Sequence, residues 1–397
     1  MANADTVRNA TNMKTHQRST VVHIITGLNV GGAERALHTL LAGGLHGAYD
    51  NEVVSLMDEG HYGPLIRQLG VRVHSLGMPG GRPNFAGSIA LVKLIKRNKP
   101  DIIQGWMYHG NLAAFCAARL ARHSAKIVWN VRSSLDNLGG EKYLTQMIIR
   151  ASRPISWSVE ANIFVSSVSR SQHEAFGYSP SNGLVIPNGF DLNRWRPDFG
   201  DRTAVRRSLG LTSHDLVLGY VGRFHSMKDQ PNLLRALRPV MDAIPNLNVV
   251  FIGRQVGPDN PALQPFIRAL PQGRLRFLGE RDDIPFLVRG FDLHCLCSAW
   301  GEGFPNVLGE AMASGVPCIT TDVGESRFIV GDTGFLVPPS DPSALAEMLS
   351  SALTEPADER IERGRRARQR IEAQFSLTKT LGAYKTLYDT VLRQNAS

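Results

Sequence analysis

Short apolar runs alternate with stretches of helical periodicity from residue 20 onward. In the first half, apolar runs fall at residues 21–25, 51–55, 101–104 and 126–130, and helical patterns at residues 34–45 and 111–122. In the second half, apolar runs fall at residues 216–221, 247–252, 275–278, 293–297 and 316–320. Most of these later runs are followed by a turn and a helical pattern. Such alternation predicts parallel sheets flanked by helices.

The alternation is interrupted at residues 192–201, a stretch rich in Pro and Arg without periodicity. Domain boundaries fall in segments of this composition. We therefore predict a disordered tail (1–19), an amino-terminal domain (20–190), a linker (191–205), a carboxy-terminal domain (206–375) and a last helix packing back on the amino-terminal domain (376–397). Ligands of doubly wound sheets bind beyond the carboxyl ends of the strands. Two such α/β domains facing each other predict an interdomain cleft.

The composition is that of an ordinary globular protein, with 43% hydrophobic, 20% charged and 7% aromatic residues among 397. These values exclude a disordered, collagen-like or coiled-coil chain. The longest apolar candidate, residues 102–118, is interrupted by polar side chains, so no membrane-spanning helix is expected. Residues 1–19 lack the apolar region of a secretion signal, and four oddly spaced cysteines form no disulfide framework. We expect a cytoplasmic protein with structural thiols.

The net charge of +9 lies almost entirely in the first half of the chain. Residues 1–190 hold 19 basic against 11 acidic residues, whereas residues 191–397 hold 25 against 24. One basic cluster ends a predicted amphipathic helix and comprises Lys93, Lys96, Arg97 and Lys99. The cluster is either a solvated helix face or a surface attracted to anionic lipid head groups. No nucleic-acid-binding motif accompanies the charge, so nucleic acid is not an expected partner.

A glycine-rich turn follows the first apolar run and leads directly into a helix. It contains Gly27, Gly31 and Gly32. Glycines permit close approach of the backbone, and a helix N-terminus offers free N–H groups to a phosphate. The spacing is neither that of a dinucleotide-binding fingerprint nor that of a P-loop. The turn therefore gives little support to a nicotinamide-binding or ATP-binding site.

Two cations lie five residues apart in the loop that opens the second domain, Gly222-Arg-Phe-His-Ser-Met-Lys-Asp229. Arg223 offers a planar fork and Lys228 a point charge, so the two could converge on a diphosphate. The alternative is a pair of exposed basic residues without a ligand.

Two glutamates lie eight residues apart in the segment Gly301-Glu-Gly-Phe-Pro-Asn-Val-Leu-Gly-Glu310. Pro305 suits the first turn of a helix, which places Glu302 in a loop and Glu310 on that helix. Glu302 could accept hydrogen bonds from a sugar and Glu310 from a ribose. The alternative for Glu310 is a solvent-facing acid on the helix surface.

Together these segments resemble the family-4 retaining glycosyltransferases (glycosyl transferases group 1), over residues 20–390. The resemblance rests on GEGFPNVLGEAMASG (301–315), GRFHSMKD (222–229), IPNGFD (186–191), the Gly31-Gly32 pair and TTDVGESRFIVGDTGFLVPPSDP (320–342). It implies two facing Rossmann-like domains, the GT-B arrangement. The second domain would bind a nucleotide-sugar and the first its acceptor. One departure is Phe328, which stands where many family members carry an acid, with Glu325 nearby.

The resemblance also assigns roles to individual positions. Arg223 and Lys228 would hold the donor diphosphate, Glu302 the donor sugar and Glu310 the ribose, while His109 would lie near the reacting sugar. The remaining donor-binding positions would be Gly31, Gly32, Gly222, Gly303, Phe304, Pro305, Asn306 and Val307. We expect Arg223, Lys228, Glu302 and His109 to serve catalysis. No Asp-x-Asp loop is present, and Asp282-Asp283 fits a helix start, so no metal or other cofactor is expected.

The predicted function is transfer of a hexose, with retention of configuration, from a nucleotide-sugar, by family frequency a UDP-sugar. The expected acceptor is a saccharide, or one linked to polyprenyl diphosphate as in surface-polysaccharide or O-antigen synthesis. The basic first half would hold the protein on the inner face of the cytoplasmic membrane. Two alternatives stay open: a nucleotide-sugar epimerase of the same fold, and a non-catalytic module that binds sugar or lipid.

Overall fold

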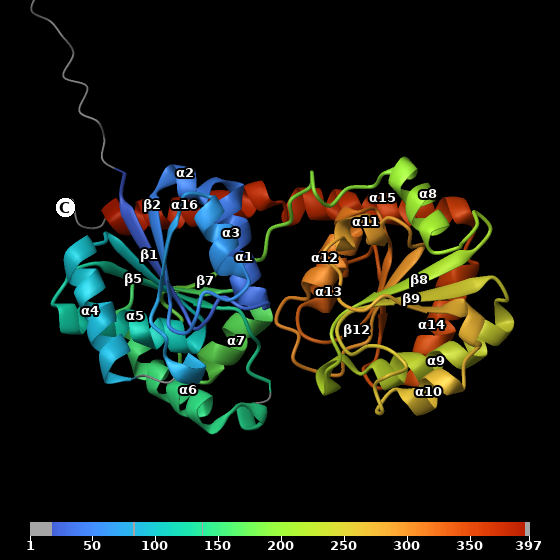
Figure 1. The fold of residues 1–397 in the computed structure, drawn as a ribbon, viewed down its shortest axis with the longest axis horizontal. Helices are drawn as coiled ribbons and strands as arrows, with labels where there is room; N and C mark the ends of the chain where they lie inside the picture. Colours follow the sequence, from blue (N-terminus) through green and yellow to red (C-terminus); the bar gives the residue numbers. More distant parts are fainter. Residues whose placement is uncertain (1–17, 82–83, 137, 394–397) are drawn as a thin grey trace, which may run out of the picture.

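The computed structural model describes residues 18–81, 84–136 and 138–393. These residues form two α/β domains that lie side by side (Figure 1). Most of the predicted amino-terminal tail (1–19) therefore lies outside the described residues. In the described ranges, no helix combines the length and the apolar character that crossing a bilayer requires.

The amino-terminal domain contains a parallel seven-stranded sheet in the order β3-β2-β1-β4-β5-β6-β7. Its strands are β1 (Thr20–Ile25), β2 (Asp50–Ser55), β3 (Arg72–Ser75), β4 (Ile102–Trp106), β5 (Lys126–Val131), β6 (Ala161–Phe164) and β7 (Gly183–Val185). The principal helices that follow strands are α1 (Gly32–Leu40), α3 (Tyr62–Gln68), α4 (Phe85–Asn98), α5 (Met107–Ala121), α6 (Tyr143–Ile155) and α7 (Ser167–Ala175). The strand order reverses direction between β1 and β4, which is the switch point of a Rossmann-like sheet.

The carboxy-terminal domain repeats this plan with a six-stranded parallel sheet in the order β10-β9-β8-β11-β12-β13. Its strands are β8 (Leu216–Val221), β9 (Leu247–Ile252), β10 (Leu275–Phe277), β11 (Leu293–Leu296), β12 (Cys318–Thr321) and β13 (Phe335–Val337). Its helices are α8 (Phe199–Ser208), α9 (Gln230–Ala243), α10 (Gln264–Arg268), α11 (Ile284–Val288), α12 (Asn306–Ala313), α13 (Ser326–Val330), α14 (Pro342–Thr354) and α15 (Ala357–Gln374). The predicted fold class, two doubly wound domains, is confirmed.

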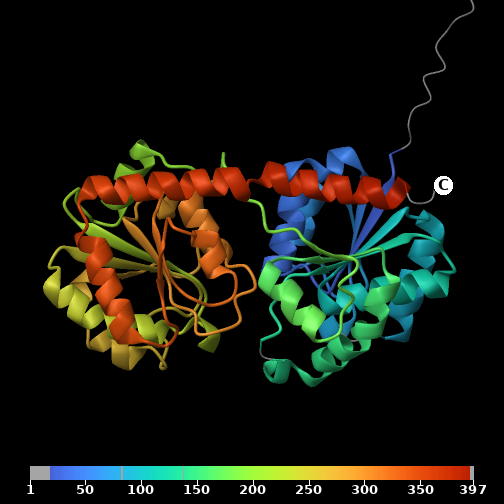
Figure 2. The ribbon, with the colours of Figure 1, turned by 180° about the vertical axis from the view of Figure 1, so that it is seen from behind.

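Each sheet carries a hydrophobic core on both faces, which explains why its central strands read as continuous apolar runs. The last helix, α16 (Leu377–Arg393), contributes Tyr384, Tyr388 and Val391 to one core of the amino-terminal domain. Figure 2 shows α15 and α16 running end to end along one side of both domains. The chain thus crosses between the domains twice, and Phe190 and Ser376 form a parallel bridge where the crossings meet.

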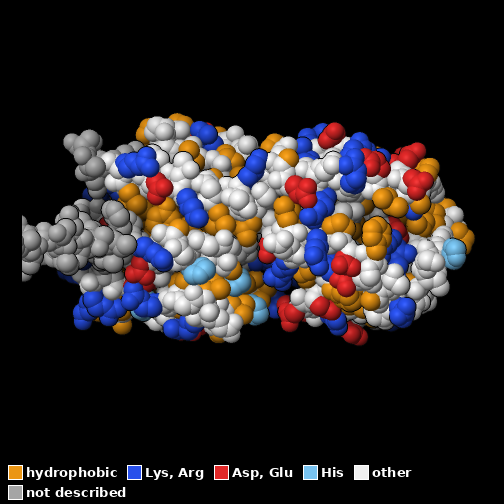
Figure 3. Space-filling view, turned by 90° about the horizontal axis from the view of Figure 1, so that it is seen from above, with side chains coloured by type: hydrophobic (Ala, Val, Ile, Leu, Met, Phe, Trp, Pro, Cys, Tyr) orange, Lys and Arg blue, Asp and Glu red, His pale blue; other side chains and the backbone are white. Residues whose placement is uncertain are grey.

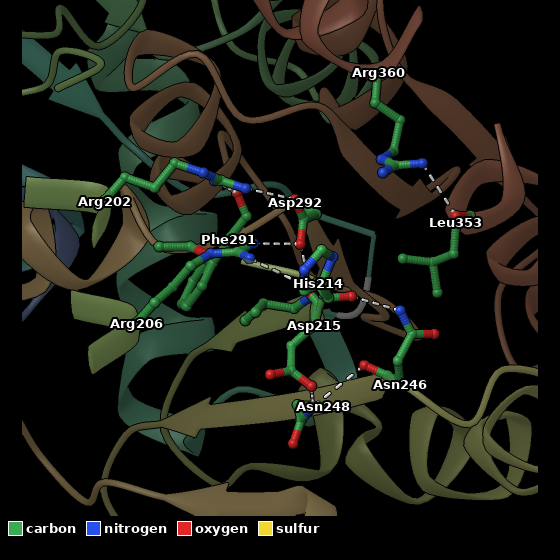
Figure 4. Close-up of polar contacts among 12 residues, drawn as sticks. Arg202, Arg206, His214, Asp215, Asn246, Asn248, Phe291, Asp292, Leu353 and Arg360 are labelled. Carbon is green, nitrogen blue, oxygen red and sulfur yellow. Dashed lines mark hydrogen bonds and ion pairs between the residues drawn. The ribbon is translucent and has the colours of Figure 1, made fainter. Parts of the chain in front are cut away.

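The predicted linker (191–205) contains most of a helix instead of an aperiodic segment. Asp198 caps α8 by accepting a hydrogen bond from the N–H of Asp201 at 3.0 Å. Arg202 and Arg206 of this helix then form ion pairs with Asp292 at 2.6 and 2.5 Å (Figure 4). The helix therefore belongs to the carboxy-terminal domain. The partner of Arg202 and Arg206 is distant in the sequence. The pattern of residues within 191–205 therefore gave little indication of a helix.

Candidate active site

The two domains meet at the carboxyl ends of their sheets, where the polar contacts that join them include one made by Gly301, one by Glu325 and one by Arg35. The N–H of Gly301 donates to Asp136 Oδ2 at 3.1 Å. Glu325 accepts from the N–H groups of Ser167 and Val168, both at 3.3 Å, at the start of α7. The third contact is an ion pair between Arg35 and Glu310. The loops beyond the strands of both sheets therefore line one interdomain seam, where ligands of such sheets bind.

Lys228 and Glu302 form the polar centre of the carboxy-terminal side of this seam. Lys228 ends a short turn after β8, and Glu302 lies in the loop between β11 and α12. Lys228 Nζ lies 2.5 Å from Glu302 Oε1, and the hydroxyl of Ser298 donates to the same oxygen at 2.5 Å. The Lys228 and Glu302 side chains are only 16% and 7% exposed. Removing one partner of such a partly desolvated ion pair would leave an uncompensated charge inside the protein.

The backbone around Glu302 is packed too closely for side chains at two glycines. A Cβ on Gly324 would lie 1.5 Å from the carbonyl oxygen of Glu302, and Gly324 has φ +57°. A Cβ on Gly301, which has φ +78°, would lie 2.6 Å from the sulfur of Met227. Glycine is required at both positions because L side chains rarely adopt positive φ. These contacts hold the loop that carries Glu302 between the loop that carries Lys228 and the loop that follows β12.

Arg223 lies on the exposed side of the same loop, directly after Gly222. Its carbonyl oxygen accepts from Gln230 Nε2 at 2.9 Å, which fixes the backbone at this position. Among the described residues, its guanidinium has neither an ion pair nor a hydrogen bond. The structure therefore places Arg223 and Lys228 on one loop, with Lys228 engaged by Glu302 and Arg223 open to solvent.

Glu310 is buried, so the alternative of a solvent-facing acid is wrong. It lies on α12 facing the amino-terminal domain, and its side chain is 5% exposed. Burial raises the pKa of Glu310, whereas the charges of Arg35 and Arg194 lower it. The guanidinium of Arg35 also lies over the ring of Trp195, 5.8 Å from its centroid. Arg35 was not predicted as a site residue, although it directly follows the glycine-rich turn.

The predicted donor-binding positions 303–307 act in different ways. Phe304 is buried, and its ring packs against Phe190 and Phe375 at 6.3 and 5.6 Å between centroids. Val307 packs against the same core. The Phe304 side chain is structural, which leaves its backbone for a ligand, whereas Val307 is half-buried. Asn306 instead accepts a hydrogen bond from Asn188 at 2.7 Å, and Gly303 lies close to Ser133 of the opposite domain. Pro305 is the N-cap of α12 in an extended conformation, one residue before the first turn in which it was predicted.

On the amino-terminal side of the seam, Gly31 precedes α1 and Gly32 is its first residue. A Cβ on Gly32 would meet no atom within 4 Å, so the fold itself does not require glycine there. This open space leaves room for a ligand at the helix N-terminus. His109 lies in the first turn of α5, beyond β4, and burial lowers the pKa of its imidazole. It is therefore neutral at pH 7.

Arg132 is a further cation at the seam that the sequence did not indicate. It follows β5 and donates to Asn130 Oδ1 at 3.1 Å, to the Tyr384 hydroxyl at 3.3 Å and to Asn188. Burial lowers its pKa. A cavity of about 140 Å³ lies between the domains beside this residue. Its polar lining includes Arg35, Arg132, Asn188, Arg194, Asn306 and Glu310.

Phe328, the departure from the family pattern, lies on the side of α15. Its ring contacts Phe375 edge-on at 5.7 Å and lies under the guanidinium of Arg370. Glu325, three residues earlier, provides the carboxylate of this segment at the seam and binds the start of α7.

A buried histidine lies close to Lys228 and makes stability depend on pH. His294 in β11 is fully buried, neither ring nitrogen has a hydrogen-bond partner among the described residues, and its pKa is lowered to about 3 by burial and by Lys228. Burial also lowers the pKa values of His23 and His173 to about 4. The unfolded chain therefore binds protons below pH 6.5 that the folded chain does not bind, so stability is complete above that pH and falls with acidification.

We expect each of these histidines to reduce the free energy of unfolding by about 2 kcal/mol between pH 7.5 and pH 5. His294→Leu should remove its share of this loss, and the matched change of exposed His214 to Leu should remove none. Chemical denaturation at both pH values measures the effect. An unchanged pH dependence in His294→Leu would contradict the assignment.

Two Rossmann-like domains, with a cationic loop and two glutamates eight residues apart at their seam, define a GT-B glycosyltransferase. Glycosyl transferases group 1 matches residues 215–355, and Glycosyltransferase Family 4 matches residues 30–194. N-acetyl-alpha-D-glucosaminyl L-malate synthase of Bacillus anthracis is 30% identical over 296 residues, which cover 72% of this chain and 73% of that protein. The chain belongs to glycosyltransferase family 4, and it is a hexosyltransferase.

Two further proteins are similar to this chain. An Escherichia coli UDP-Gal:alpha-D-GlcNAc-diphosphoundecaprenol alpha-1,3-galactosyltransferase is 27% identical over 215 residues, covering 53% of this chain and 54% of that enzyme. Among solved structures, Anabaena Alr3699/HepE in complex with UDP-glucose is similar, with a TM-score of 0.80 at 22% identity. The match covers 94% of this chain and 99% of that one. This structural likeness shows the shared GT-B fold.

Proposed function

We propose that the enzyme transfers a hexose from a UDP-sugar, with retention of anomeric configuration, to a saccharide carried on polyprenyl diphosphate. The observation that carries this proposal is the convergence of Lys228–Glu302 and Arg35–Glu310 on one interdomain seam. Lys228 provides a cation for a diphosphate, and Glu302 and Glu310 provide carboxylates for sugar and ribose hydroxyls. The galactosyltransferase relative, whose donor is UDP-Gal and whose acceptor is alpha-D-GlcNAc-diphosphoundecaprenol, supports both substrate classes.

In the proposed complex, Arg223 and Lys228 bind the diphosphate, and Glu302 turns from Lys228 toward the donor sugar. Gly31 and Gly32 at the start of α1 approach the phosphates from the opposite domain. Negative charge develops on the diphosphate as the glycosidic bond breaks, and fixed cations stabilise that charge. No metal is part of this proposal, so EDTA should leave turnover unchanged.

Retention is proposed to proceed by attack on the face from which the nucleotide departs. The acceptor hydroxyl forms the new bond to the anomeric carbon while a phosphate oxygen of the leaving group takes its proton. His109 is neutral and lies beyond β4. In this proposal it stabilises the oxocarbenium-like transition state and does not act as an obligatory base. Nuclear magnetic resonance of the first-formed product anomer tests retention.

The acceptor side of the proposal rests on the charge of the amino-terminal domain. Lys93, Lys96, Arg97 and Lys99 are all exposed at the end of α4 and after it. Figure 3 shows basic side chains gathered at the outer edge of this domain, whereas basic and acidic side chains are mixed on the other domain. A lipid-linked acceptor lies at a membrane surface, where such residues attract anionic lipids. Equal retention by neutral and anionic vesicles at low salt would contradict peripheral membrane binding.

Thermal unfolding in the presence of nucleotides tests the donor directly. We expect UDP at 100 times its Kd to stabilise the protein by about 2.7 kcal/mol, because it binds the native state alone. GDP and ADP should shift the melting temperature less. A selective response to GDP would replace the UDP assignment, and no response to any of them would contradict the donor site.

Incubation of the donor without acceptor distinguishes the proposed transferase from the epimerase of the same fold. We expect slow hydrolysis or no reaction, whereas an epimerised nucleotide-sugar would favour the epimerase.

A further inference from the structure

The carboxylate of Glu310 is held by a residue of the opposite domain. Arg35 projects from α1 and forms an ion pair with Glu310 Oε1 through Nη2. Within the described parts of the chain, this is the only ion pair or hydrogen bond found for the Glu310 carboxylate. One of its two oxygens is therefore engaged, and Oε2 has no partner among the described residues. Glu310 is one of the residues that line the interdomain cavity.

Arg35 is itself fixed in place. Its guanidinium lies over Trp195, a residue that is 4% exposed in the segment between the domains. Stacking on an aromatic ring restricts the orientation of a guanidinium without using its N–H donors. Trp195, Arg35 and Glu310 therefore connect the interdomain segment, the amino-terminal domain and the carboxy-terminal domain in one chain of contacts.

Burial raises the pKa of Glu310, and the charges of Arg35 and Arg194 oppose this larger effect, so Arg35 influences which hydrogen bonds Glu310 can make. Burial favours the neutral acid, which would carry a proton on one oxygen. The neighbouring guanidinium favours the carboxylate, which accepts hydrogen bonds only. The vicinal hydroxyls of a ribose are donors, so an ionised and oriented carboxylate binds them more strongly than a protonated one does.

We propose that Arg35 is a positioning residue for the donor, which orients Glu310 Oε1 across the seam so that Oε2 accepts a hydroxyl of the nucleotide ribose. This inference rests on the proposed function, because it assigns the ribose to Glu310. Recognition of ribose then requires both domains in the arrangement seen here. The nucleotide would stabilise that arrangement as it binds.

The test measures the Kd of UDP, 2′-deoxy-UDP and 3′-deoxy-UDP by calorimetry. In the unaltered enzyme, loss of the recognised hydroxyl should weaken binding about tenfold, since a hydrogen bond to a charged group contributes about 1.5 kcal/mol. Arg35→Gln should weaken the binding of UDP about tenfold. It should also reduce the ratio between the Kd of the deoxy form and the Kd of UDP to less than about threefold. The KM for the donor should rise more than kcat falls.

Several variants separate positioning from folding. Arg35→Lys keeps the cation and should restore part of the preference for ribose, and Arg35→Gln combined with Glu310→Gln avoids an unpaired buried charge. Arg238→Gln is the matched control, because Arg238 is exposed and pairs with Asp242 on α9. Melting temperatures show whether each variant folds.

Two results would overturn the inference alone: full discrimination retained in Arg35→Gln, or tighter binding of UDP by that variant. The second would mean that Arg35 competes with the ribose for Glu310. If the unaltered enzyme binds UDP, GDP and ADP with no preference for ribose over its deoxy forms, the assignment of Glu310 is wrong. If it binds none of the three nucleotides, the proposed function fails as well.

Discussion

Replacing Arg223 by alanine is expected to lower turnover by about two orders of magnitude or more, with little change in stability. The guanidinium is exposed and has no partner among the described residues, so its removal leaves no buried charge uncompensated. In the proposed reaction it binds the diphosphate as negative charge develops there. Loss of one such fixed donor costs about 10² to 10³ in kcat.

The measurement is steady-state turnover with the donor identified by thermal shift, together with the melting temperature of the variant. Arg238→Ala is the control, since it removes another exposed arginine of the same domain, one that pairs with Asp242 on α9. Near-normal turnover in folded Arg223→Ala would remove Arg223 from the proposed site.

Replacing Lys228 by methionine is expected to reduce both turnover and stability. Its ammonium group neutralises Glu302 inside the protein, where the glutamate side chain is 7% exposed. Removing one partner of a buried ion pair leaves an uncompensated charge, and the partial exposure of Lys228 limits the cost to about 2 kcal/mol. Turnover should fall about 10²-fold, because a cation at the diphosphate is lost.

The double variant Lys228→Met with Glu302→Gln separates these two effects. It removes both charges, so the free energy of unfolding in denaturant should recover most of the loss. Turnover should stay low, because neither the cation nor the carboxylate is present. Recovery of turnover along with stability would show that the pair is structural and would contradict its proposed place at the donor.

The sequence predicted the fold through local patterns. Buried parallel strands read as apolar runs because both faces of each sheet are covered, and helix starts are visible as glycine or proline turns. The short strands β3, β6, β7 and β13 were not predicted, whereas β10 and β11, which are equally short, were predicted from the apolar runs that contain them. The prediction of a linker over 191–205 was wrong where α8 begins at Phe199, because that helix is stabilised by Asp292, which is about 90 residues away.

For the site, the sequence by itself determined the chemistry of the loops: the cations at 223 and 228, the acids at 302 and 310 and the glycine-rich turn before α1. These features are local, because each is a short run of residues that follows a strand and can be read directly from the sequence. Only the tertiary structure decided which groups meet. It paired Lys228 with Glu302 and Glu310 with Arg35, and it placed Glu325 at the start of α7. The physical reason is that these pairs join segments 74 to 275 residues apart, across two sheets and a domain seam, and no local pattern encodes such a distance.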